Sequence, residues 1–106
     1  MELKYQQRID ALNNTKALEK TITYGVSGKT IELSFPQEII SGNFSGDIYF
    51  FRPSDAGKDI KFSMKPGAGG KQVIESNQLI HGSYKMQMSW QKDGKKYFKE
   101  EVIFIQ

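Results

Sequence analysis

The sequence predicts an all-β fold, an antiparallel sandwich of about seven strands, preceded by an N-terminal α-helix. Apolar and polar residues alternate over several short segments, Gly and Pro separate these segments, and aromatic residues make up 12% of the chain. Aromatic and β-branched side chains favour strands because they pack well on a pleated surface. The expected strands cover residues 22–26, 30–35, 45–52, 60–64, 72–75, 83–91 and 97–105.

Residues 2–19 have a helical pattern without Gly or Pro. Its apolar stripe is thin, with Leu3, Ile9 and Leu12 as the main members. A helix of this length and polarity is marginal alone in water. We therefore expect it to pack only loosely on the sandwich. This divides the chain into a helical segment, residues 1–20, and a β-sandwich domain, residues 21–106.

The last two strands meet at Asp93-Gly94, a strong hairpin turn signal. A two-residue loop would place Lys99 and Glu101 on the core face. A loop with a Gly bulge shifts the register by one residue and buries more apolar surface, so we expect this second register. It places Phe98, Glu100, Val102 and Phe104 opposite Trp90, Met88, Met86 and Tyr84.

Three residues before and within the long sixth strand are expected to determine the fold. In immunoglobulin-like sandwiches a Tyr near the start of a late strand bonds back to the backbone at the corner. Tyr84 follows Gly82 at the start of such a strand and fits this role. Trp90 shares the apolar face of the strand with Tyr84, so we expect it to be buried. The sandwich is therefore expected to be immunoglobulin-like.

The composition argues against an enzyme. The chain has no Cys, a single His and no Gly-x-Ser-x-Gly motif, so neither a thiolate site nor a nucleophile–base pair is indicated. The net charge of +3 is mild, and the one group of basic residues surrounds a turn together with acidic ones, which is typical of a solvated hairpin tip. Nucleic-acid binding is therefore not expected. The basic residues of this group are Lys92, Lys95, Lys96 and Lys99.

One pattern suggests copper. Met86 and Met88 lie on the same face of a strand and His81 lies just upstream, and thioethers and imidazole suit Cu(I). The competing interpretation is that both Met side chains fill the core, where Met commonly packs. Core packing is favoured, and no cofactor is expected, because both Met residues alternate with polar neighbours on the strand: Lys85, Gln87 and Ser89.

The segment Arg52-Pro53-Ser54-Asp55, followed by Asp59, is a candidate structural or partner-binding motif. Pro53 keeps Arg52 extended, and Ser54 and Asp55 can cap the following turn. Arg52 either pairs locally with Asp55 or Asp59, which we favour, or offers its planar guanidinium to a partner.

Three stretches of the chain together resemble the FixH family. The most specific is Gly46-Asp47-Ile48-Tyr49-Phe50-Phe51-Arg52-Pro53-Ser54-Asp55 with the following Asp59. The second is Leu79-x-x-Gly82-x-Tyr84, which continues through Trp90 and Asp93-Gly94 to Tyr97 and Glu101. The third is the helix with Tyr5-Gln6 and Ile9-Asp10, which is similar to the stretch after that family's membrane anchor.

The resemblance implies a function that composition alone does not. Members are small membrane proteins with one N-terminal transmembrane helix and an extracytoplasmic immunoglobulin-like domain, associated with assembly or accumulation of the cbb3-type cytochrome c oxidase. They act with a copper-transporting ATPase and a membrane iron–sulfur protein. The resemblance thus implies a cell inner membrane protein with this domain on the periplasmic side, attached by an anchor that this sequence lacks. It carries over no catalytic residues.

Two other functions stay open at this point. The first is an extracytoplasmic Cu(I)-binding module that uses Met86, Met88 and His81. The second is a ligand-binding β-sandwich with exposed aromatic side chains, for which the candidates are Tyr49, Phe51 and Tyr97.

Overall fold

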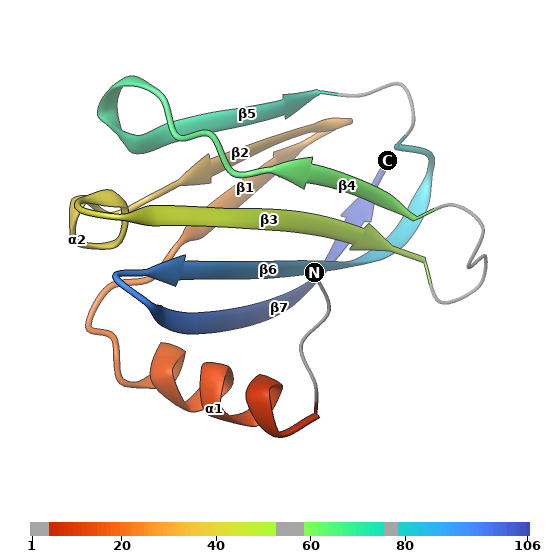
Figure 1. Ribbon diagram of the computed structural model, residues 1–106. Helices are drawn as coiled ribbons and strands as arrows, with labels where there is room; N and C mark the ends of the chain where they lie inside the picture. Colours follow the sequence, from red (N-terminus) through yellow and green to blue (C-terminus); the bar gives the residue numbers. More distant parts are fainter. Residues whose placement is uncertain (1–4, 53–58, 76–78) are drawn as a thin grey trace.

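Two antiparallel sheets lie face to face in the computed structural model, which describes residues 5–52, 59–75 and 79–106 (Figure 1). One sheet has the order β1-β2-β5 and the other β4-β3-β6-β7, so the expected all-β sandwich of about seven strands is confirmed. The strands are β1 (Thr23–Ser27), β2 (Thr30–Ser34), β3 (Phe44–Phe51), β4 (Ile60–Ser63), β5 (Lys71–Glu75), β6 (Gly82–Lys92) and β7 (Lys95–Ile105). The helical elements are α1 (Tyr5–Lys16), α2 (Gln37–Ile40) and the short 3₁₀ turn η2 (Ala68–Gly70).

The hydrophobic core fills the space between the two sheets. Its side chains come from alternate residues of each strand, as twofold periodicity requires. Trp90 is only 3% exposed, which confirms its expected burial, and its ring stacks on Tyr97 with centroids 5.5 Å apart. The core side chains with no exposed surface are Ile22, Ile31, Leu33, Ile48, Phe50, Leu79, Met86, Met88 and Ile105.

The register of the β6–β7 hairpin differs from the bulged one that we expected. Asp93 and Gly94 have φ angles of 50° and 84°, which are those of a two-residue turn whose twist matches the strands. Met88 therefore faces Lys99, and Met86 faces Glu101. The expected pairing was wrong because it counted only apolar area between the sheets. The observed pairs are Trp90–Tyr97, Met88–Lys99, Met86–Glu101 and Tyr84–Ile103.

Two charged residues, Lys99 and Glu101, lie on the inward side of β7. They are tolerated there because β7 is an edge strand of its sheet. The Lys99 Nζ donates a hydrogen bond to the Ile22 carbonyl at 2.8 Å and lies 3.4 Å from a Glu101 carboxylate oxygen. Long side chains can bury their apolar stems while the charged end reaches a polar partner. The register thus leaves Phe98, Val102 and Phe104 on the outer face of the sheet.

Helix α1 packs closely on β7, so the expectation of loose packing was wrong. Ala11 is only 1% exposed and Phe98 only 5%. The Thr15 hydroxyl accepts a hydrogen bond from the Phe98 N–H at 3.0 Å and lies 2.9 Å from its carbonyl oxygen. The Asn14 amide donates to the Lys96 carbonyl at 2.8 Å. Side chains of the helix therefore occupy backbone groups that an edge strand leaves unpaired.

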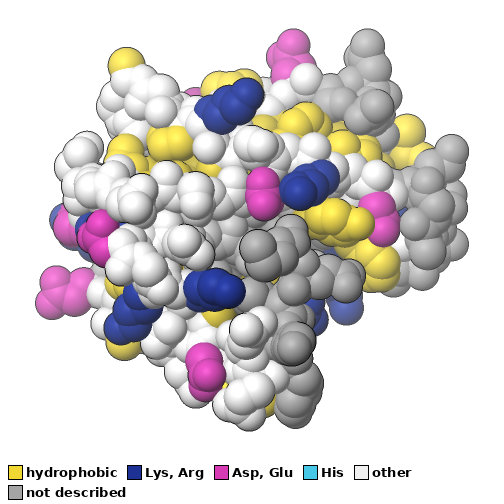
Figure 2. Space-filling view, viewed as in Figure 1, with side chains coloured by type: hydrophobic (Ala, Val, Ile, Leu, Met, Phe, Trp, Pro, Cys, Tyr) yellow, Lys and Arg dark blue, Asp and Glu magenta, His cyan; other side chains and the backbone are white. Residues whose placement is uncertain are grey.

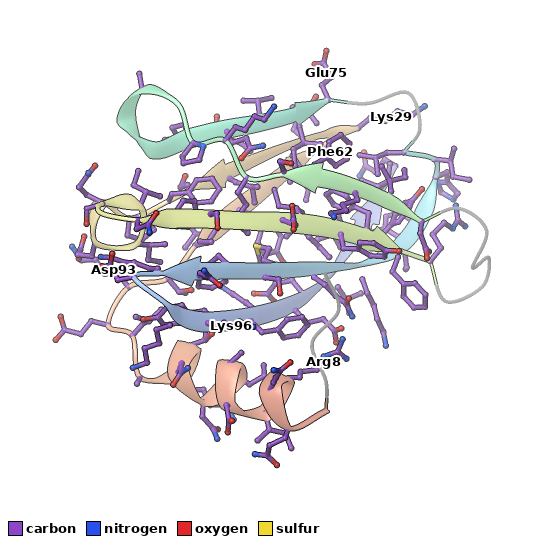
Figure 3. All side chains as sticks on the ribbon, in the orientation of Figure 1. Arg8, Lys29, Phe62, Glu75, Asp93 and Lys96 are labelled. Atoms are coloured by element: carbon purple, nitrogen blue, oxygen red, sulfur yellow. The ribbon has the colours of Figure 1, made fainter. Side chains whose placement is uncertain are left out.

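Arg8 completes the contact between α1 and β7. Its guanidinium carbon lies 4.8 Å from the centroid of the Phe98 ring, within the range of a cation–π interaction, and Figure 3 shows Arg8 between the helix and the sheet. The helix ends at Lys16, before the expected residue 19, because Ala17 and Leu18 bond to carbonyls three residues back. Such bonds tighten the last turn of a helix. The division at residue 20 stays a prediction.

The Gly-rich segment after Pro66 forms the 3₁₀ turn η2 and leads into β5. Gly70 has a φ of +72°, and a Cβ there would lie 2.4 Å from the Phe35 carbonyl oxygen. The Phe35 N–H in turn donates to the Gly70 carbonyl at 2.7 Å. A side chain at position 70 would separate these two backbones, so Gly is required there.

The burial of Trp90 leads to a stability prediction. Trp90→Ala should lower the free energy of unfolding by about 3–5 kcal/mol, the usual range for a large core aromatic. Chemical denaturation followed by far-UV circular dichroism would measure the change. Because Trp90 is the single Trp of the chain, native fluorescence at the wavelength of solvent-exposed Trp would contradict the burial itself.

The Thr15 contact leads to a second prediction. Thr15→Val keeps the shape of the side chain but leaves the Phe98 N–H without its acceptor, so it should destabilise the fold by about 1–3 kcal/mol. Thr15→Ser retains the hydroxyl and serves as the matched control. Equal unfolding midpoints for the two variants in urea would show that the hydroxyl does not stabilise the edge of β7.

Candidate functional site

The corner that leads into β6 is held by Tyr84. Its phenolic oxygen accepts a hydrogen bond from the Ile80 N–H at 3.0 Å, which confirms the expected bond back to the backbone. Tyr84 is 1% exposed, and its ring meets Phe50 edge-on with centroids 6.3 Å apart. The corner is thereby fixed to the core of the four-stranded sheet.

Arg52, which directly follows β3, reaches across to the same corner. Its Nη1 donates to the His81 carbonyl at 3.2 Å, and its guanidinium carbon lies 5.3 Å from the centroid of the Tyr84 ring. Gly82 has a φ of +128°, and a Cβ there would lie 2.9 Å from the Arg52 Nη2. Gly82 therefore supplies both the backbone angle and the space that the guanidinium occupies.

The rest of the Arg-Pro-Ser-Asp motif is seen only at its far end. Pro53, Ser54 and Asp55 lie outside the described residues, and so does the expected pairing of Arg52 with Asp55. Asp59, just before β4, accepts a hydrogen bond from the Tyr49 hydroxyl at 3.3 Å, and the expected alternative pairing of Arg52 with Asp59 is not among the ion pairs of the described residues. The described hydrogen bond of Arg52 joins it to a corner 29 residues later in the chain.

Apolar side chains gather on the outer face of the four-stranded sheet, beside this corner. Val102 is 68% exposed, Phe104 53% and Tyr49 37%. Register places Phe51, Lys85 and Val102 side by side on three neighbouring strands, so Lys85 has an apolar residue on each side of it in the sheet. Figure 2 shows hydrophobic side chains on this face separated by single charged ones, with a group of them at its right-hand end.

The three copper candidates are not on one face. Met86 and Met88 have no exposed surface and point into the core. His81 is exposed, and its ring meets Phe104 edge-on at 5.3 Å on the outer face. Among the described residues, no group of three His, Cys, Asp or Glu side chains is placed to hold a metal ion.

The aromatic candidates for ligand binding are exposed to different extents. Tyr49 is partly exposed, whereas Phe51 and Tyr97 are half-buried. Tyr97, with Trp90, Leu18 and Ile39, lines a hollow of about 490 Å³ beside the hairpin tip. Within the described ranges, no helix is long and apolar enough to cross a membrane.

Sequence reasoning missed the residues that dock α1. Arg8, Asn14 and Thr15 are polar, so a search for apolar periodicity passes over them, although Arg8 and Thr15, seven residues apart, share one helix face. The available signal was a Thr and an Asn next to each other near the end of a helix, where their side chains compete for backbone groups.

The corner leads to a prediction about Gly82. Gly82→Ala should destabilise the fold by about 1–3 kcal/mol through backbone strain alone. The new methyl group also displaces Arg52, which should add to this loss. Gly28→Ala is the control, since Gly28 also has a positive φ, +60°, but has no atom near its Cβ position. In an Arg52→Ala background the loss at Gly82 should shrink. An unchanged loss, measured by thermal unfolding, would contradict the contact.

Comparison with known proteins gives one match. The model of the FixH family matches residues 1–104, almost the whole chain. No curated protein and no solved structure matches the chain. The match includes both the Arg52 motif and the Tyr84 corner that Arg52 clamps, and it agrees with the resemblance in the sequence. The chain belongs to the FixH family.

Proposed function

We propose that the chain is the extracytoplasmic domain of a membrane-anchored accessory protein that assists assembly or accumulation of a cbb3-type cytochrome c oxidase. Family membership supports a role related to this oxidase. In this proposal the domain lies on the periplasmic side of the cell inner membrane, and an anchor precedes α1. It acts without catalysis, by contact with membrane proteins of the assembly machinery, including a copper-transporting ATPase.

The observation that carries the contact role is the exposed apolar part of the outer sheet face. Contiguous apolar patches on the surface of a globular domain commonly mark interaction sites. Aromatic side chains are enriched at protein interfaces, and Tyr49 and Phe51 supply them here. Lys85 lies among them with no ion-pair partner in the described part of the chain. A partner surface with apolar groups and one carboxylate would complement this face.

A charge reversal tests the contact role. Lys85→Glu, in the full-length protein with its anchor, should lower the amount of assembled oxidase several-fold, because a carboxylate repels the acidic group that we propose on the partner. Lys29→Glu is the matched control, since Lys29 is an exposed Lys in the β1–β2 turn of the other sheet. Membrane haem spectra would measure the oxidase, and immunoblots would show equal amounts of both variants.

Equal oxidase levels in the two strains would rule out the outer face as the contact surface. The wider proposal is tested by deletion of the gene and restoration with the wild-type protein. Normal oxidase in the deletion strain would show that the protein has no part in accumulation of the oxidase.

The copper alternative can be tested with one double variant. Met86→Leu with Met88→Leu nearly conserves side-chain volume, so it should cost under about 1.5 kcal/mol per site, and we expect oxidase assembly to continue. Leu offers no lone pair to copper, so a Cu(I) carrier would lose binding. Loss of oxidase activity in this variant while it remains folded and abundant, with recovery on added copper, would favour the copper module.

A further inference from the structure

The first part of the outer edge of β7, at Lys96 and Phe98, is covered by α1. Lys92 faces Lys95 across the two-residue turn, which makes this pair hydrogen-bonded and every second pair after it likewise. Even-numbered residues of β7 therefore direct their N–H and C=O groups away from β6. The bonds of Asn14 to Lys96 and of Thr15 to Phe98 agree with this direction.

The same backbone direction continues through Glu100, Val102 and Phe104, which lie beyond the residues that Asn14 and Thr15 bond. No partner for the N–H or C=O groups of these residues lies within the described part of the chain. The side chains of Val102 and Phe104 do not protect the edge, since they are apolar and 68% and 53% exposed. Natural edge strands are normally blunted by charge, by Pro or by a covering element.

The other edge of this sheet shows such protection. The Gln72 side chain donates to the Ser63 carbonyl at 3.1 Å and accepts from the Lys65 N–H at 2.7 Å. Lys61 adds a charge on the same short strand. One edge of the sheet is thus closed by a side chain and a charge, while the end of β7 is open and apolar.

We propose that this open end of β7 pairs with the same segment of a second copy of the chain, antiparallel and around a twofold axis at Ile103. Val102 would form a hydrogen-bonded pair with Phe104 of the second copy, and Phe104 with its Val102. The two four-stranded sheets then form one continuous sheet, and the four exposed apolar side chains cover one another on its outer face.

Neighbouring registers are less favourable. An axis at Glu101 sets two carboxylates opposite each other, and like charges directly opposite are destabilising. It also brings Phe104 of the second copy to Phe98, whose outward groups Thr15 already occupies. An axis at Val102 sets Glu100 opposite Phe104. The axis at Ile103 avoids these conflicts and places the smaller Val against the larger Phe.

The charges near the axis favour a second copy as the occupant. Lys99 and Glu101 already neutralise each other at 3.4 Å, and Lys85 and Glu100 are of opposite sign on neighbouring strands. This zone therefore has no net charge to repel its own copy, although the whole chain has a charge of +3. The paired segment is short, so the dimer should be weak and depend on concentration.

Sedimentation equilibrium of the 106-residue chain tests the proposal. The average mass should rise toward that of a dimer between micromolar and millimolar concentration. Val102→Lys should weaken association by about tenfold or more, equivalent to 1.4 kcal/mol per factor of ten. Val73→Lys is the matched control, because Val73 is 57% exposed on another edge strand, β5, and it should leave association unchanged. Thermal unfolding would show that both variants fold.

Engineered cysteines test the register, since the chain has none of its own. A mixture of Val102→Cys and Phe104→Cys chains should form disulfide-linked dimers faster than either chain alone. A chain that stays monomeric at every concentration would overturn the proposal. So would a dimer that Val73→Lys weakens and Val102→Lys does not, or cross-linking of either single variant as fast as the mixture.

Discussion

The two-residue turn at Asp93-Gly94 sets the register on which the rest of the structure depends. A shift of one residue would exchange the two faces of β7. In the observed register Ile103 and Ile105 face the core, and Lys99 and Glu101 lie at its open side. Phe98 then needs a cover on the outer face, and α1 supplies it. The position of the helix is therefore a consequence of the turn.

Polar side chains that close sheet edges are a second recurring feature. Thr15 closes part of the β7 edge, and Gln72 closes the end of β4. Both bond the N–H and C=O groups that a ladder would otherwise use, so they stop further pairing and stabilise the edge together. Val102 and Phe104 lie beyond the reach of these polar side chains, and their own apolar side chains are exposed. Edge protection and the location of the candidate interaction surface are thus two results of one distribution of polar residues.

The sequence predicted what periodicity and turn chemistry control. All expected strands, the buried Trp90 and the corner bond of Tyr84 follow from alternation and from Gly placement. It did not predict the hairpin register, because both faces of β7 carry apolar residues and the choice between a two-residue turn and a bulged turn at Asp93-Gly94 fixes which face points inward. The bond of Arg52 to the His81 carbonyl was also missed, since no local pattern links residues 29 positions apart. Tertiary contacts between polar groups leave no periodic signal.

The Arg52 clamp links the most specific part of the family pattern to the fold. Its guanidinium lies on Tyr84, bonds the residue before Gly82 and fills the space that Gly82 leaves. Arg52, Tyr84 and Gly82 hold one another in place through these contacts. Their role in the corner therefore explains why the three residues occur together, and no partner protein is needed for that explanation. Phe51, directly before Arg52, points instead to the outer face beside Lys85. The end of β3 thus fixes the corner with one residue and contributes to the exposed face with the residue before it, which ties the geometry of that face to the integrity of the corner.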